Sequence, residues 1–126
     1  MVAQVQNAGL ARITAALIGL SWWLQWGTGS GAAKSANVVT TTTTTEARSS
    51  VVTPAQGMTT VANDKIVLAA IITAAGVRAI TEVGAFDAAG SSSPPTGGNM
   101  DVYCDFSVIN LALGDSISFT LNVTFS

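Results

Sequence analysis

The C-terminal segment 116–126 alternates polar and apolar residues without an exception. The apolar members share one side of an extended chain: Ile117, Phe119, Leu121, Val123 and Phe125. Ser, Thr and Asn fill the opposite side. A period of two over this length predicts a long strand with one face on a core and the other face in water. The wet face carries no charge, which is unusual for the surface of a protein that stays monomeric in water.

The chain has few charges and little of the usual equipment for catalysis. Its 126 residues fit one domain, with 10% charged residues, a net charge of -2, one Cys and no His. A weakly charged surface can pack against copies of itself or a larger shell at low desolvation cost. The alternative is that a small Ser/Thr-rich domain simply has an uncharged surface. We expect no enzyme, no cofactor, no metal site and no disulfide.

The five Lys and Arg residues are scattered singly along the chain, which argues against nucleic acid as a partner. The segment 1–20 predicts a short helix over about residues 4–18, ending near Gly19. One face of this helix would pack on the sheet or on a neighbouring copy. The apolar run 13–26 is shorter than the roughly 20 residues that cross a bilayer. We therefore expect neither a membrane span nor a signal peptide.

Three tryptophans, Trp22, Trp23 and Trp26, lie close together directly after the segment 1–20. In an extended chain, Trp22 and Trp26 are in phase with Leu24, which favours a place in the core or in a subunit interface. Trp23 lies on the opposite face, where it would meet a partner; a stacking platform for sugars or bases is the alternative. The glycine-rich stretch 27–31 lacks the remainder of a phosphate-binding motif, so a flexible turn is expected.

The run of six threonines, 40–45, allows three interpretations: an edge strand, an extended arm across a neighbouring copy, or a mobile loop. The segment 46–48 is expected to continue it in extended form. After a turn at 54–57, residues 58–61 predict a strand. The apolar run within 65–73 predicts a central strand buried on both faces, with a buried helix as the rival.

Two further strands are predicted at 78–86 and 101–110, separated by the Ser/Pro/Gly-rich loop 88–99. Glu82 lies mid-strand among apolar neighbours, so a partner on an adjacent strand is expected. In total, residues 21–126 predict a single, mainly β domain of six to eight strands. The fold class is an antiparallel, jelly-roll-like β-sandwich with the short N-terminal helix as a separate segment.

Two motifs carry a resemblance to a known group. Segment 79–88 is Ala-Ile-Thr-Glu-Val-Gly-Ala-Phe-Asp-Ala, and segment 110–120 is Asn-Leu-Ala-Leu-Gly-Asp-Ser-Ile-Ser-Phe-Thr. They resemble the "Ile-Thr-Glu-Ala-Gly-Leu-Phe-Asp-Ala" and "Gly-Asp-Ser-Ile-x-Phe-Thr" patterns of small virion proteins of tailed bacteriophages, with the closest likeness to cyanophage sequences. The segment 26–31 resembles the Trp-Gly-Thr-Gly that these proteins carry before a Thr-rich stretch. Val83 and Ala85 depart mildly from the pattern.

The resemblance implies a virion location, an oligomeric β-fold and no catalytic residue. The expectation is a decoration or cement protein that binds the major capsid protein on the capsid exterior as a homo-oligomer. The alternative is a tail or fibre module that binds host surface carbohydrate through Trp23, Tyr103 and the loop 88–99. The expected interface residues are Leu10, Ile13, Leu17, Trp22, Trp23, Trp26, Thr42, Thr44 and Tyr103.

Overall fold

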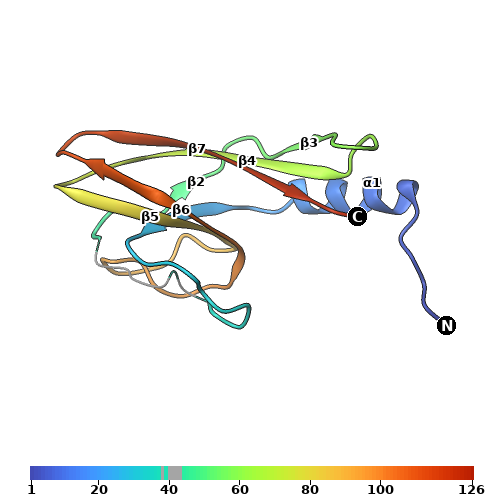
Figure 1. The fold of residues 1–126 in the computed structure, drawn as a ribbon, viewed down its shortest axis with the longest axis horizontal. Coiled ribbons are helices and arrows are strands. Elements are labelled where there is room, and N and C mark those ends of the chain that lie inside the picture. Colours follow the sequence, from blue (N-terminus) through green and yellow to red (C-terminus); the bar gives the residue numbers. More distant parts are fainter. Residues whose placement is uncertain (38, 40–43) are drawn as a thin grey trace.

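The computed structural model describes residues 1–37, 39 and 44–126 and shows two antiparallel sheets with one helix at the N-terminal end (Figure 1). The elements are α1 (Asn7–Ile18), β1 (Trp23–Gly27), β2 (Ser49–Ser50), β3 (Ala55–Gly57), β4 (Lys65–Thr73), β5 (Arg78–Phe86), β6 (Met100–Leu111) and β7 (Ser116–Thr124). The strand orders are β2-β1-β5-β6 and β3-β4-β7. The predicted mainly β fold with a short N-terminal helix is confirmed. The described residues form seven strands, whereas a complete jelly roll has eight.

The two sheets pack face to face around one apolar core. Buried residues of both sheets form a single cluster, which includes Leu24, Trp26, Val83, Ala85, Ile66, Leu68, Ala70, Ile72 and Phe119. The indole of Trp26 meets the ring of Phe119 edge-on, with ring centroids 6.4 Å apart. This geometry suits the ring quadrupoles and joins a strand of one sheet to a strand of the other.

The prediction that residues 65–73 are buried on both faces is wrong. In β4, Ile66, Leu68, Ala70 and Ile72 are buried, whereas the alternate residues are more accessible and Ile71 is 59% exposed. The reason is that β4 has a sheet on one side only. It pairs with β7 over nine residues, from Lys65↔Thr124 to Thr73↔Ser116, and the residues of both strands that face away from the core are mostly exposed.

The prediction of a strand at 58–61 is also wrong, because this segment is a turn organised by Asp64. The carboxylate accepts hydrogen bonds from the backbone amides of Thr59, Thr60 and Val61, at 2.6, 2.9 and 3.0 Å, and from the Thr59 hydroxyl at 2.5 Å. Such local bonds compete with strand pairing for the backbone amides. The strand of this region, β3, lies just before the turn and pairs with the start of β4.

Helix α1 begins three residues later than predicted, and residues 1–6 extend away from the body (Figure 1). The helix packs on β3 and β4. Buried Thr14 links it to the sandwich, because its hydroxyl donates to the Asn63 carbonyl at 2.8 Å and lies 2.8 Å from the Gln56 amide nitrogen. The Trp22 indole donates to the Leu17 carbonyl at 2.9 Å. Among the described residues there is no helix long and apolar enough to span a membrane.

The turn between β6 and β7 has backbone requirements that account for part of the second motif. Gly114 has φ +88°, a conformation that side chains disfavour. The Asp115 carboxylate accepts from the Ala112 amide at 2.8 Å, which closes the turn. This turn carries the chain from the edge of one sheet to the edge of the other.

Candidate interaction surface

Strands β6 and β7 are the edge strands of the two sheets, and the space between them is open. Each pairs with one strand of the described chain, β6 with β5 and β7 with β4. Two grooves of about 260 and 360 Å³ follow the line between them. We call the apolar lining of these grooves the seam; its members on or just beyond the two strands are Val102, Phe106, Ile109, Ile117, Phe119, Leu121, Val123 and Phe125.

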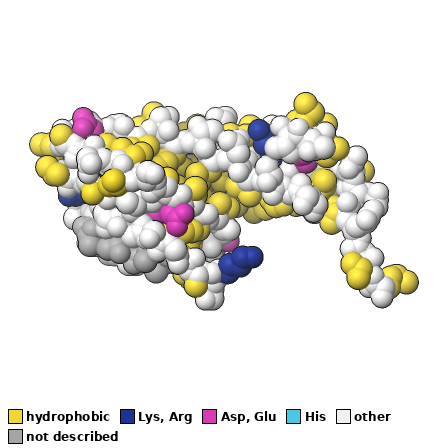
Figure 2. Space-filling model, in the orientation of Figure 1, with side chains coloured by type: hydrophobic (Ala, Val, Ile, Leu, Met, Phe, Trp, Pro, Cys, Tyr) yellow, Lys and Arg dark blue, Asp and Glu magenta, His cyan; other side chains and the backbone are white. Residues whose placement is uncertain are grey.

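The seam is only partly covered by the chain itself. Phe119 is buried, whereas Ile117, Leu121, Val123 and Phe125 are half-buried. Ile109 is 39% exposed. The apolar face of the last strand therefore points inward as predicted, but no further strand of the described chain closes the edge above it. Hydrophobic side chains gather along the lower side of β7 and continue toward α1 (Figure 2).

The seam is almost free of charge. Among the described residues that line its two grooves, Asp101 is the one with a charged side chain. Burial raises the pKa of Asp101, and repulsion from the Asp87 carboxylate raises it further. Cys104 is an exposed free thiol on β6. The surface is therefore apolar along the strands, with one acidic group at the start of β6.

The opposite, outer face of the four-stranded sheet is covered by a loop layer, which we define as the described residues of 28–48 and 87–99. Beneath it, Glu82 and Phe86 are fully buried although they point away from the core. Glu82 accepts from the Tyr103 hydroxyl at 2.7 Å and from the Gly29 amide at 3.2 Å. The predicted partner on an adjacent strand is thereby confirmed, since Tyr103 belongs to β6.

Arg48 ties the two halves of the loop layer to the sheet. Its guanidinium lies 3.6 Å from the centroid of the Phe86 ring. It donates to the Gln25 side-chain oxygen at 2.8 Å and to the carbonyls of Ala88 and Gly97 at 2.8 and 2.9 Å. Burial lowers the pKa of the guanidinium, and the nearby Asp87 carboxylate offsets part of this effect. Sequence analysis did not identify this cluster.

Glu46 forms a second buried anchor, at the end of the core. It makes an ion pair with Arg78, 3.0 Å from its Nε, and accepts from the Ala75 amide at 2.8 Å. The Trp26 indole also donates to it, at 3.4 Å. Burial raises the pKa of Glu46, but these hydrogen bonds lower it by more, so the net shift is downward. The alternate residues Thr44, Glu46 and Arg48 are all buried, so this segment is fixed on one face.

Because the pKa values of Glu46 and Asp64 are lowered in the fold, we expect acid to destabilise the protein. The hydrogen bonds that Asp64 accepts, first from the Thr59 hydroxyl, hold its pKa well below the ordinary value of 3.8. A carboxylate with a lowered folded-state pKa stabilises the fold fully above its unfolded-state pKa and loses this contribution as the pH falls. We expect the free energy of unfolding of the wild type to decrease below about pH 4. Urea denaturation at several pH values measures it.

Asp64→Asn is the matched variant for this prediction. It keeps the shape of the side chain but places an amide group among backbone donors, so it should be less stable than the wild type at neutral pH. The difference between the two proteins should shrink as the pH falls, because the wild-type carboxylate becomes protonated. A difference that stays constant down to about pH 2 would contradict the assignment.

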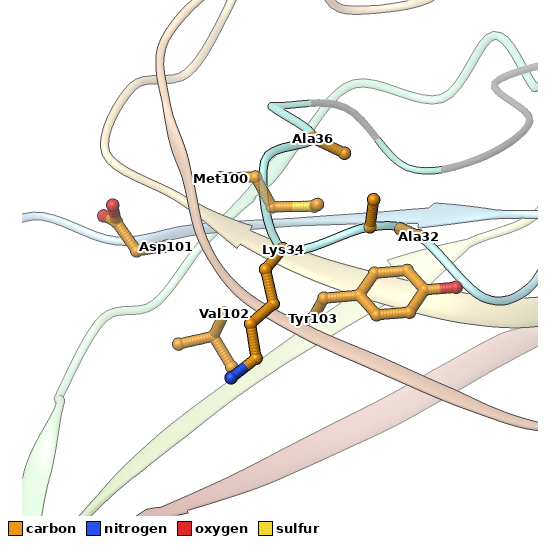
Figure 3. A pocket seen from close by; sticks show the side chains of 8 residues that line it. Ala32, Lys34, Ala36, Met100, Asp101, Val102 and Tyr103 are labelled. Atoms are coloured by element: carbon orange, nitrogen blue, oxygen red, sulfur yellow. The ribbon is translucent and has the colours of Figure 1, made fainter.

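A further groove, of about 400 Å³, lies beside Tyr103. In Figure 3 the segment 32–36 forms one side and the start of β6 the other, with the Lys34 side chain extending past Val102 and the Asp101 carboxylate directed away. The Tyr103 ring lines the groove while its hydroxyl is held by Glu82. No group of three or more His, Cys, Asp or Glu side chains suited to a metal ion occurs among the described residues.

The expected interface residues fall into three groups. Leu10, Trp22, Trp26 and Thr44 are buried within this chain, at 6%, 4%, 1% and 1% exposure. They therefore stabilise the fold and offer almost no surface to a partner. Ile13 is 39% exposed, and half-buried Leu17, Trp23 and Tyr103 retain accessible surface. Leu17 lines a seam groove, whereas Thr42 lies outside the described residues.

The open seam was not predicted from the sequence. The alternation of both strands was identified, but their apolar faces were expected to be covered. The signal that was present is the pair of long strands without Lys or Pro, residues that commonly protect an exposed strand edge.

Comparison with known proteins adds no relative: no family model, curated protein or solved structure matches this chain. The resemblance of its two motifs to phage virion proteins stays a prediction.

Proposed function

We propose that this chain is a structural protein of a phage virion, a decoration or cement protein that binds the major capsid protein on the outside of the head. It would act as a homo-oligomer and stabilise the shell by repeated subunit contacts. The observation that carries the proposal is the open apolar seam on a small, weakly charged β-sandwich. Contiguous exposed apolar surface of this kind marks protein–protein contact sites.

The motif resemblance supplies the setting for such contacts. A shell presents one site many times, so a modest affinity per contact becomes strong retention once several contacts are made together. The buried anchors at Glu46 and Arg48 fit this role, because they hold loops firmly on a scaffold. A protein of this design contributes surface and stability to an assembly.

The copy number of the chain in purified virions tests the proposal. Quantitative mass spectrometry, normalised to the major capsid protein and to a tail protein of known low copy number, should give about one chain per capsid subunit or a fixed large fraction of it. Absence of the chain from virions would refute the virion role.

The alternative function, a tail or fibre module that binds host carbohydrate, is favoured by the groove beside Tyr103 (Figure 3). An aromatic ring at the wall of an open groove is a common platform for a sugar. A copy number as low as that of the tail protein would support this alternative. Binding to host polysaccharide that is lost in Trp23→Ala or Tyr103→Ala would then locate the site.

A further inference from the structure

We infer that this chain associates head to tail: a protruding apolar tip at one end of the sandwich enters an apolar groove at the helix end of a second copy. The tip consists of the turns 74–77 and 112–115. The groove, which we call the helix-end groove, is the seam groove of about 360 Å³ beside Leu17 and Leu20. The inference rests on the proposed homo-oligomer and specifies the two surfaces that form it.

The tip presents two aliphatic side chains to solvent. Val77 is 82% exposed and Leu113 is 74% exposed. They lie one residue before Arg78 and two residues after Leu111, which pair at the end of the β5–β6 ladder. Both therefore belong to the end of the molecule opposite α1 (Figure 1), where hydrophobic side chains gather on the surface (Figure 2). Exposed apolar surface of this kind marks a contact site, and because the tip is convex, its partner must be concave.

Hydrogen bonds hold the two turns of the tip in place. The Gly114 amide donates to the Ala74 carbonyl at 2.8 Å, and the Ala74 amide donates to the Asp115 carbonyl at 2.7 Å. The Ala75 amide donates to the buried Glu46 carboxylate at 2.8 Å, which fixes the first turn to the body. A tip that is ordered before it binds loses little conformational entropy on association.

The helix-end groove is concave and apolar. Its apolar lining includes Leu20, Trp22, Ile66, Val102, Val123 and Phe125. Trp22 and Ile66 are buried, whereas Leu20 is 57% exposed and available to a partner. A volume of about 360 Å³ lies within the range of pockets that enclose small apolar groups. The groove therefore has room for the aliphatic side chains of a tip.

The tip and the groove complement each other between copies, because they lie at opposite ends of one chain. Strand β4 runs from one end to the other: Ile66 lines the groove, and Thr73 directly precedes the first turn of the tip. Its nine residues span about 30 Å at about 3.3 Å per residue, so the tip cannot reach the groove of its own chain. A convex and a concave surface on the same chain make a head-to-tail contact that repeats from copy to copy.

The charges at the two ends favour the same arrangement. Arg78 directly follows Val77, and its side chain is 21% exposed although Glu46 pairs with it. Asp101 brings a carboxylate to the groove. The acidic side chain of the tip, Asp115, accepts a hydrogen bond from a backbone amide of its own turn. Opposite charges beside an apolar contact orient the approach of two copies more than they add to affinity.

The contact between two free copies is expected to be weak. Few side chains enter the groove, so the buried area falls in the class of transient interfaces, and we expect a dissociation constant of about 100 μM. Neighbouring copies on a shell have effective concentrations in the millimolar range, at which such a contact is mostly formed.

A mixing experiment with two variants of the full chain tests the inference without any capsid. Leu113→Asp disables the tip and Leu20→Asp disables the groove. Both residues are more than half exposed, so each monomer keeps the new charge in water. In sedimentation equilibrium at about 300 μM, the wild type should exceed the chain mass of 12.7 kDa. Each variant alone should dissociate, with its dissociation constant raised at least about 10-fold.

An equimolar mixture of the two variants should associate again, and only as a heterodimer. The intact tip of Leu20→Asp meets the intact groove of Leu113→Asp, while the two altered surfaces stop further growth. This recovery is specific to a head-to-tail contact, because two copies that met through the same surface would gain nothing from mixing.

Val52→Asp is the matched control, because Val52 is 86% exposed and lies outside the tip and the groove. It should associate like the wild type. A wild-type mass of one chain at about 500 μM, single variants that associate like the wild type, or a mixture that stays monomeric would each overturn the inference. None of these results affects the copy number in virions, so failure of the contact and failure of the virion role are separate outcomes.

Discussion

Trp26→Ala is expected to destabilise the isolated chain by about 3–5 kcal/mol, without any partner present. The Trp26 side chain is 1% exposed, packs edge-on against Phe119 across the two sheets and donates to Glu46. Its removal opens a cavity between the sheets and takes one donor from a buried carboxylate. Since small domains are typically stable by only 5–15 kcal/mol, a large part of the total stability would be lost. Urea denaturation of both proteins measures the difference.

Trp23→Ala is the matched control on the same strand. Trp23 is half-buried and belongs to the other face of β1, so its loss should cost about 1 kcal/mol. The pair of variants separates the two roles that the sequence left open for these indoles. If Trp26 acted in a subunit interface, its replacement would weaken association and leave the unfolding free energy of the monomer unchanged, which would contradict the core assignment.

The strands with strict alternation were predictable because a period of two is a local property of the chain. Arg78–Phe86 was located to the residue, and β6 and β7 nearly so. Whether a face is covered depends on the other sheet, which is not local. For this reason Ile71, in the middle of an apolar run, is 59% exposed, and the apolar face of the last strand lines an open seam. The seam could not be predicted from alternation alone.

The turn at 58–64 shows a second limit. Thr59, Thr60 and Val61 have high strand propensity. Their amides donate hydrogen bonds to the Asp64 carboxylate, however, and are therefore not available for pairing with a neighbouring strand. Propensity was outweighed by side-chain hydrogen bonds. An acidic residue a few positions after a Thr-rich stretch could have indicated such a turn, because its carboxylate can reach back to the preceding amides.

The loop layer was missed for a different reason. Thr44, Glu46 and Arg48 are buried at alternate positions, and the sequence places two opposite charges, Glu46 and Arg48, two residues apart. Two opposite charges on the same face of an extended segment each need a partner, and this was the available signal. The partners are the Gln25 side chain, two backbone carbonyls and the Ala75 backbone amide, at separations of 23 to 49 residues, and spacing along the chain does not reveal them.

Arg48→Met is expected to destabilise the fold by about 3 kcal/mol. Methionine keeps an unbranched apolar stem but removes the guanidinium from the Phe86 ring. It also leaves the Ala88 and Gly97 carbonyls and the Gln25 oxygen without the donor that now serves them. Buried groups that lose a partner cost about 1–3 kcal/mol each. Part of this cost is offset, because Nη2 of Arg48 is itself buried without a partner among the described residues. The loop 87–99 should then exchange its amide hydrogens faster, while β4 and β7 stay protected.

Lys34→Met is the control for the loss of one positive charge, because Lys34 is exposed at the groove beside Tyr103. That variant should stay within about 0.5 kcal/mol of the wild type. If both variants lost the same stability, net charge would explain the effect and the anchoring role of Arg48 would be refuted. A loss confined to Arg48→Met, with loop 87–99 loosened first, would show that one buried guanidinium holds this layer on the sheet.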